Sequence, residues 1–180
     1  MRLTCLSLVL SLLASSAFAQ EVSTAVAPPV EDTGTLADAP YRIDIPADWN
    51  GELVMLAHGF EPVGVPRETP WPADPATSMF TSARYAVAQS GYATQGWAVR
   101  DAIADSERLR AHFVQRHGQP EKTWMVGFSM GGGIAIATLE QQAAYYDGAL
   151  SLCGANLPGD VLANALFTSL VAFDALFPPR

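Results

Sequence analysis

The chain has 180 residues, of which 49% are hydrophobic and 16% are charged, so it can bury the core of about one ordinary domain and is not a disordered protein. Its 10 basic and 18 acidic side chains give a formal net charge of -8, and Lys122 is the only lysine. Phosphate contacts need clustered Lys and Arg, so we exclude a nucleic-acid-binding function.

The first nineteen residues have the pattern of a secretory signal peptide. Arg2 gives a positive start, residues 3–13 are apolar, and residues 17–19 form an A-x-A cleavage site. The alternative is a buried N-terminal helix, while the apolar run is too short to span a bilayer. We therefore expect a secreted or periplasmic protein, cleaved after residue 19. Cleavage leaves Cys153 as the only cysteine, so the mature chain has no internal disulfide.

The mature chain begins with a polar segment and continues into two strand patterns. Residues 20–40 contain prolines, four acidic residues and few large apolar side chains, which predicts a flexible leader. Residues 41–45 alternate apolar and polar side chains, as a half-buried strand does. Residues 53–57 form a continuous apolar run, which suits a strand buried on both faces of a parallel sheet. This run leads directly into the pair His58 and Gly59.

A proline-rich loop and an alternation of helices and strands follow. Residues 61–78 contain five prolines, and loops of this length in compact domains are often functional. Apolar spacing and glycine stops then predict a helix from Phe80 that ends at Gly91, a weaker strand over 92–97, a helix over 99–113 that Gly118 closes, a strand over 123–126, a helix over 131–142 and a strand over 149–153. This alternation indicates an α/β fold, in which a mostly parallel sheet has helices on both faces.

The strongest chemical signal is the motif Gly127-x-Ser129-x-Gly131. A strand ends just before it and a helix begins at Met130, so Ser129 lies on a sharp strand-to-helix turn. Neighbouring side chains must then be very small, which explains Gly127 and Gly131. The turn exposes the Ser129 hydroxyl and points the first N–H groups of the helix toward it. The alternative is a glycine-rich helix start with an incidental serine.

With this motif, and with His58 and Gly59 after an earlier buried strand, the chain from about residue 41 onward resembles the α/β-hydrolase superfamily, in particular secreted serine esterases and lipases. The resemblance implies that Ser129 is the nucleophile. It also implies that the backbone N–H groups of Phe60 and Met130 form the oxyanion hole, where one donor is typically worth about 3–4 kcal/mol. We expect His58 to brace its loop by hydrogen bonds, with a catalytic role as the alternative.

The sequence departs from this family where the general base should be. The family order is serine, acid and then histidine, but His58, His112 and His117 all precede Ser129. We expect His117 to be a favourable charge at a helix C-terminus and neither helical histidine to reach Ser129. Asp160 is the candidate acid, because a minority of related lipases place their acid after the corresponding strand; the alternative is a helix N-cap.

The tail, residues 161–177, is almost wholly apolar and resembles the first helix of an inserted cap. Asn164 and Asp174 argue against a stable membrane anchor, and we expect self-association through this helix. The predicted fold is thus a partial α/β-hydrolase, with the last strands and most of the cap absent. Its parts are a signal peptide (1–19), a flexible leader (20–40), the N-terminal part of the hydrolase domain (41–160) and a truncated cap (161–180).

The predicted function is hydrolysis of carboxylic esters through an acyl-enzyme on Ser129, with little activity in this chain alone because the triad histidine is missing. Three alternatives stay open: a non-catalytic binding or scaffold protein, an enzyme whose base comes from another chain, and a peptidase or acyltransferase on the same fold. We expect no metal and no cofactor, since the chain has neither metal-ligand spacing nor a phosphate-binding or dinucleotide motif.

Overall fold

The computed structural model describes residues 28–177 of the chain. Its elements, in chain order, are β1 (Val30–Leu36), β2 (Ala39–Ile45), β3 (Glu52–Ala57), α1 (Thr77–Ser82), β4 (Ala86–Ser90), α2 (Val99–His117), β5 (Lys122–Phe128), α3 (Met130–Gln142), the 3-10 helix η1 (Ala143–Tyr145), β6 (Gly148–Leu152) and α4 (Gly159–Leu176). The predicted signal peptide lies outside the described residues and stays a prediction.

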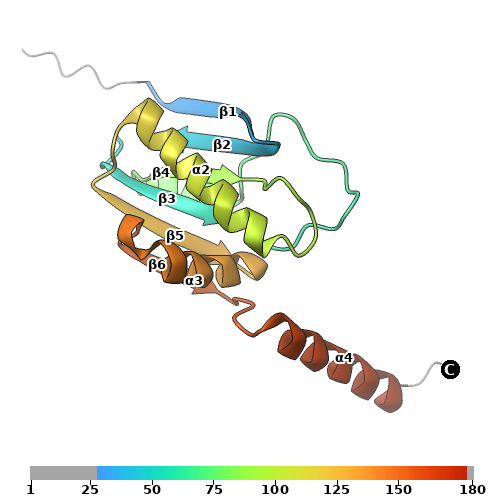
Figure 1. The fold of residues 1–180 in the computed structure, drawn as a ribbon. Helices are drawn as coiled ribbons and strands as arrows, with labels where there is room; N and C mark the ends of the chain where they lie inside the picture. The colour runs from blue at the N-terminus through green and yellow to red at the C-terminus, as the bar shows by residue number, and fades with distance from the viewer. Residues whose placement is uncertain (1–27, 178–180) are drawn as a thin grey trace, which may run out of the picture.

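The strands form one mixed sheet in the order β1-β2-β4-β3-β5-β6. β4, β3, β5 and β6 run parallel, while β2 pairs antiparallel with β4 and with β1 (Figure 1). In the middle of the sheet, Met55 of β3 lies opposite Ala88 on one side and Met125 on the other. The predicted α/β fold with a mostly parallel sheet is confirmed.

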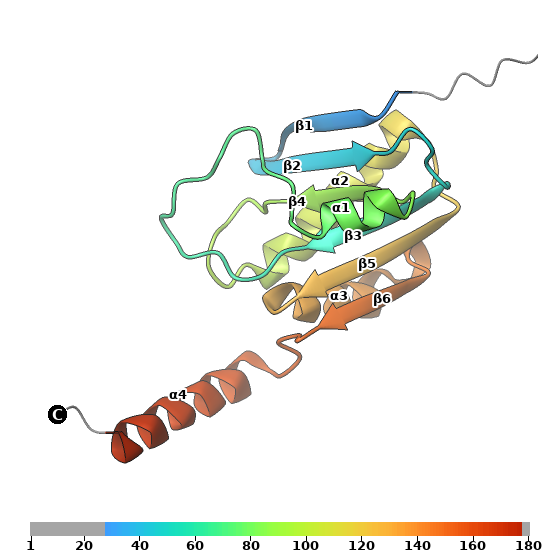
Figure 2. The same cartoon turned by 180° about the vertical axis from the view of Figure 1, so that it is seen from behind.

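Helices lie on both faces of this sheet, but they cover them unequally. α2 and α3 pack on one face and the short α1 packs on the other (Figures 1 and 2). Successive side chains of a strand point to opposite faces, so each central strand contributes to two clusters. The face of α2 and α3 holds the larger cluster, which includes Leu53, Met55 and Phe113. The hydrophobic cluster on the face of α1 is smaller, and its buried residues are Val54, Leu56, Val87 and Val126.

The first strand corrects the prediction of a flexible leader over residues 20–40 in the part that the structure describes, residues 28–40, while residues 20–27 lie outside the described residues. β1 pairs with β2 along its whole length, from Val30 opposite Ile45 to Leu36 opposite Ala39. An acidic residue that suggested a solvated segment holds the strand in place instead, because Asp32 accepts a hydrogen bond from the Tyr41 hydroxyl and contacts Arg116 and His117 of α2. The leader pattern failed here because backbone pairing and a fixed carboxylate need few apolar side chains.

The segment from Phe80 to Gly91 also differs from its predicted helix. α1 ends at Ser82, Arg84 has a φ of 71°, and Ala86–Ser90 forms the buried strand β4. Apolar residues at 80, 83 and 87 fit helical spacing, but Val87 belongs to a short apolar run that lies between β2 and β3 in the sheet. Residues 92–97, which were predicted to form a strand, are a loop, because the strand of this region is β4 and it ends at Ser90.

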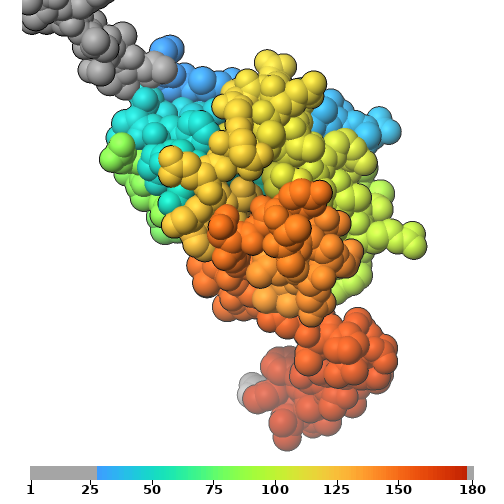
Figure 3. All heavy atoms as spheres, turned by 60° about the vertical axis from the view of Figure 1, so that its left-hand side comes forward, coloured from blue at the N-terminus to red at the C-terminus, as the bar shows by residue number. Residues whose placement is uncertain are grey.

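The last described helix, α4, is apolar and exposed. It follows β6 through a short connection and extends away from the sheet (Figures 1 and 3). None of its residues is buried, and its length and composition would allow it to cross a membrane. Its identity as the start of a cap stays a prediction.

Candidate active site

Ser129 lies in a strained turn between β5 and α3. Its φ is 58° and its ψ is -122°, a backbone conformation that residues other than glycine rarely adopt. The Ser129 N–H donates to the carbonyl of Leu152 at 3.0 Å, and the Ser129 carbonyl accepts from the N–H of Ala155 at 3.0 Å. The turn therefore has the geometry that the motif predicts, and the end of β6 holds it on both sides.

The two outer glycines of the motif are required by close backbone packing. A Cβ on Gly127 would lie 1.9 Å from the carbonyl oxygen of Gly131. A Cβ on Gly131 would lie 1.9 Å from the carbonyl oxygen of Ala57 at the end of β3. No side chain fits at such distances, so these glycines allow α3 to begin directly against the central strands.

The segment after β3 runs beside Ser129. A Cβ on Gly59 would lie 3.5 Å from Ser129 Cβ and 3.9 Å from Ser129 Oγ. Phe60 follows with 56% of its surface exposed. Within residues 28–177, the backbone N–H groups of Phe60 and Met130 donate to no acceptor in the loops and caps. Their predicted role as oxyanion donors stays a prediction.

His58 packs into the wall of the site. Its Nδ1 lies 2.8 Å from the Gly59 carbonyl oxygen, so Nδ1 carries the proton. Its ring stacks on Tyr92 with the ring centroids 4.0 Å apart, and the Tyr92 hydroxyl donates to the His58 carbonyl at 3.3 Å. Burial lowers the pKa of His58, which keeps the imidazole neutral at pH 7. These contacts fit a bracing residue, and none of them reaches Ser129.

The other two histidines lie on α2, where they face the β1–β2 hairpin. His112 Nε2 is 3.2 Å from the Tyr41 hydroxyl, and His117 Nε2 is 3.3 Å from Asp32 Oδ2. His117 thus contacts Asp32 from the last turn of α2. All three histidines of the chain fall within the described residues, and none of them hydrogen bonds to Ser129.

Asp160, the candidate acid, lies in the first turn of α4 and is exposed. Among residues 28–177, the Asp160 carboxylate forms no hydrogen bond or salt bridge. The N-cap of α4 is Pro158, so the alternative of Asp160 as the N-cap is wrong. The role of Asp160 as the triad acid stays a prediction.

A mainly apolar pocket of about 350 Å³ opens beside the Ser129 turn. It lies where β3, β5 and β6 end and where α1 begins. Asp74 and His58 are the titratable side chains of its lining, and His58 is neutral at pH 7. Its lining residues are Leu56, Ala57, His58, Gly59, Asp74, Pro75, Ala76, Val126, Gly127, Phe128 and Leu152.

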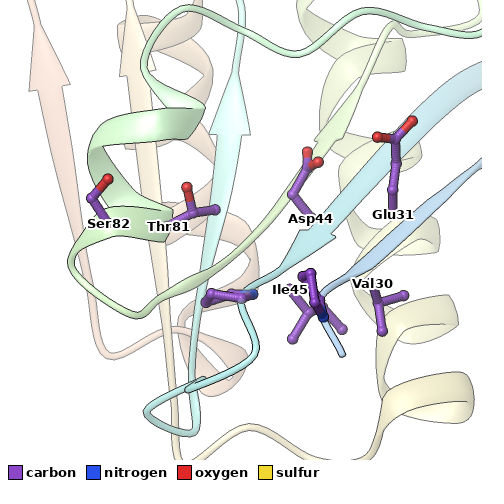
Figure 4. A pocket seen from close by; sticks show the side chains of 8 residues that line it. Val30, Glu31, Asp44, Ile45, Thr81 and Ser82 are labelled. Carbon is purple, nitrogen blue, oxygen red and sulfur yellow. The ribbon is translucent and has the colours of Figure 1, made fainter. Parts of the chain in front are cut away.

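A second pocket, of about 420 Å³, lies at the opposite edge of the sheet, between the β1–β2 hairpin and the end of α1. Figure 4 shows Glu31 and Asp44 on neighbouring strands, with Thr81 and Ser82 across from them. Arg42 forms ion pairs with both carboxylates, at 2.7 Å from Glu31 and 2.8 Å from Asp44. The acids of this pocket are thus satisfied within the fold.

Sequence reasoning missed a polar cluster next to Phe60. Glu61 and Arg67 form an ion pair, and Gln95 from the loop after β4 donates to the same carboxylate. A Glu and an Arg six residues apart in a proline-rich loop were the available signal, but only the fold brings Gln95 to them.

Comparison with known proteins was made by sequence and by structure. No family model matches the chain, and no curated protein sequence does. Solved structures match it in shape. Dienelactone hydrolase from Anabaena variabilis aligns with a TM-score of 0.54 at 16% identity, over 71% of this chain and 65% of that chain.

Two further structures match to a similar degree. The carboxyl esterase from Bacillus coagulans gives a TM-score of 0.52 at 17% identity, over 78% of this chain and 51% of that chain. The acylaminoacyl peptidase from Pyrococcus horikoshii gives 0.53 at 13% identity, over 70% and 22%. The chain spans less than two thirds of the length of each of these three proteins. Their common architecture is also that of the sheet and helices described above: this chain has the α/β-hydrolase fold.

Proposed function

We propose that the chain carries the nucleophilic half of a serine hydrolase site, with Ser129 as the acyl acceptor. The observation that supports this most is the strained backbone at Ser129, next to the Gly59–Phe60 segment. A φ of 58° at a non-glycine residue costs free energy, and such strain tends to cluster at functional sites. The matching fold of an esterase and a dienelactone hydrolase is in keeping with this chemistry.

In the proposed reaction, Ser129 Oγ attacks the carbonyl carbon of an ester while a base removes the hydroxyl proton. The negative charge on the former carbonyl oxygen is stabilised by the N–H groups of Phe60 and Met130. The alcohol leaves with a proton, and water then releases the acyl group from Ser129. The products are a carboxylic acid and an alcohol.

The proton acceptor is the part that residues 28–177 do not supply. His58 is held by Gly59 and Tyr92, while His112 and His117 face the β1–β2 hairpin. We therefore propose that this chain alone turns over esters slowly. A site with its oxyanion hole but without a working triad still accelerates hydrolysis by roughly 10³–10⁴-fold over water.

The pocket beside the turn supports a proposal for the class of ester. Its walls are mainly apolar, and Asp74 places a negative charge at one side of it. The whole chain is also acidic, with a formal charge of -8. We propose that small uncharged acyl groups bind here in preference to anionic ones, because an anion would be repelled and would lose its hydration.

Chemical rescue by imidazole tests the proposal. If only the base is lacking, added imidazole should accelerate acetylation of Ser129 by p-nitrophenyl acetate, and the acetyl group should be located on Ser129 by peptide mass spectrometry. The variant Ser129→Ala is the control for direct hydrolysis of the ester by imidazole. An acceleration equal in both proteins would contradict the proposal and would favour a non-catalytic binding protein.

A further inference from the structure

Two loops meet beside the candidate site. β3 and β4 are parallel, so the segments that follow them leave the sheet at the same end of the strands (Figures 1 and 2). Two hydrogen bonds join them, one at each end of residues 58–61: the His58 carbonyl accepts from the side-chain hydroxyl of Tyr92 at 3.3 Å, and the Glu61 carbonyl accepts from the Gly96 N–H at 2.7 Å. Only Gly59 and Phe60 lie between the two held positions.

The side chain of Glu61 adds a second connection between the same loops. Arg67 Nε donates to both carboxylate oxygens of Glu61 at 3.0 Å, and Gln95 Nε2 donates to one of them at 3.0 Å. Arg67 Nη1 donates to the Tyr92 carbonyl at 2.7 Å. Tyr92 itself has a φ of 54°, so this bond holds a residue in an otherwise unfavourable conformation. The four residues form one continuous network, which we call the Glu61 clamp.

The clamp is largely shielded from water. The side chains of Glu61 and Arg67 are only 17% and 19% exposed. Burial alone would raise the pKa of Glu61, but hydrogen bonds from Arg67 and Gln95 outweigh it and hold that pKa below its ordinary value. Glu61 is therefore ionised at neutral pH, and a bidentate charged pair of this kind fixes geometry more strictly than a neutral hydrogen bond.

We propose that Glu61, through Arg67 and Gln95, is a positioning residue that fixes the backbone N–H of Phe60 beside Ser129. This inference rests on the proposed serine hydrolase function. Glu61 directly follows Phe60, and the loop has few buried apolar side chains that could hold it instead. A donor that is already oriented stabilises developing negative charge without reorganisation, whereas a mobile donor does not.

The variant Glu61→Gln tests the inference, because it keeps the size of the side chain and removes its charge. In the imidazole-assisted reaction of the full chain with p-nitrophenyl acetate, we expect the maximal rate constant for acetylation of Ser129 to fall about 10–100-fold. The ester concentration at half-maximal rate should change less than about threefold, because ground-state binding does not use the oxyanion hole.

Glu107→Gln is the matched control. Glu107 and Arg110 form a similarly shielded pair on α2, with side chains 16% and 13% exposed, and Glu107 also accepts from Tyr146. It lies away from the Ser129 turn, so its loss should leave the rate constant within about twofold. An equal loss of rate in both variants, or an unchanged rate in Glu61→Gln, overturns the inference while leaving Ser129 as the nucleophile.

A second measurement does not depend on reactivity. The Gly96 N–H is protected by the Glu61 carbonyl, so we expect its hydrogen exchange to accelerate at least tenfold in Glu61→Gln and to stay unchanged in Glu107→Gln. If Ser129 fails to react even with imidazole, the proposed function fails. The exchange of Gly96 then still decides whether Glu61 fixes the loop, and an unchanged rate overturns that claim.

Discussion

The two faces of the sheet are closed to different degrees although the same strands supply both. On the face of α2 and α3, Leu53, Met55, Met125 and Phe113 are buried completely or nearly so. On the face of α1, the edge strand β6 is open: its Leu150 remains 49% exposed, and Figure 2 shows no helix over β5 and β6 on this side. The difference lies in the covering helices and not in the strands.

This contrast explains where the candidate site is well defined. The Ser129 turn begins α3, the helix that closes the first face, and its glycines contact the backbone of β3. The site is thus built on the closed half of the molecule, where close packing fixes positions. The pocket beside Ser129 opens toward the other half, where fewer residues hold the walls.

Truncation of a core side chain should give the largest difference between the two faces. Phe113→Ala removes a fully buried ring under α2, and we expect it to lower the free energy of unfolding by about 3–5 kcal/mol. Leu150→Ala on the open face should cost about 1 kcal/mol or less, because half of that side chain already contacts water. Urea unfolding followed by circular dichroism measures both; similar losses would show that the open face is covered in solution.

Adding one methyl group should give the next largest effect. In Gly131→Ala the new Cβ meets the Ala57 carbonyl oxygen, so we expect a loss of about 3 kcal/mol. Gly159→Ala in the first turn of α4 meets nothing within 4 Å, and the free energy of unfolding should change by no more than about 0.5 kcal/mol. Equal thermal midpoints for the two variants would mean that α3 does not begin against β3 as described.

The sequence predicted the closed half better than the edges. The continuous apolar run of β3, the strand–turn–helix at Ser129 and the glycine stop after α2 all depend on local patterns, and the structure has them where they were expected. β1 and β4 were missed for physical reasons. β1 is held by backbone pairing and by Asp32, and β4 is too short for its period to be distinguished from that of a helix.

One part of the candidate site could also be predicted from the sequence and another part could not. The motif around Ser129 could be found because its glycines are adjacent in the sequence. The Glu61 clamp could not, because Gln95 lies 34 residues from Glu61 and only the parallel pairing of β3 with β4 brings the two loops together. The contact between Asp32 and His117 of α2 could not be predicted either, because 85 residues separate the two in the sequence.

A smaller effect is expected from pH. Burial lowers the folded-state pKa of His58, and likewise that of His112, below the ordinary value of 6.5. The unfolded chain therefore takes up protons at a higher pH than the folded chain, so stability should fall as the pH drops below about 6.5. Urea unfolding at pH 7.5 and 5.5 measures this.

The variant His58→Phe should reduce this pH dependence, because phenylalanine keeps a ring against Tyr92 and does not titrate. His112→Asn should reduce it as well, since both shifts have the same sign. If neither variant reduces the loss of stability on acidification, burial of the two imidazoles is not its cause.

A substitution in the exposed helix α4 should have the smallest effect on stability. Its effect on self-association should be larger. Phe173 is 62% exposed, so Phe173→Ser should change the free energy of unfolding by no more than about 0.5 kcal/mol. We expect the chain to self-associate through its exposed apolar side chains, and this substitution should weaken that association in sedimentation velocity. A monodisperse monomer in both proteins would contradict the expectation.

The hydrogen bonds that hold Ser129 have a practical consequence, because the exposed Cys153 lies between the two residues that make them. Leu152 accepts the Ser129 N–H, Ala155 donates to its carbonyl, and Cys153 is the one cysteine among the described residues. Its thiol is accessible to a fluorescent label. In a chain expressed without residues 1–19, which include Cys5, Cys153 is a single attachment point for an optical reporter beside the serine, and a change in its emission would follow events at the turn without any added cysteine.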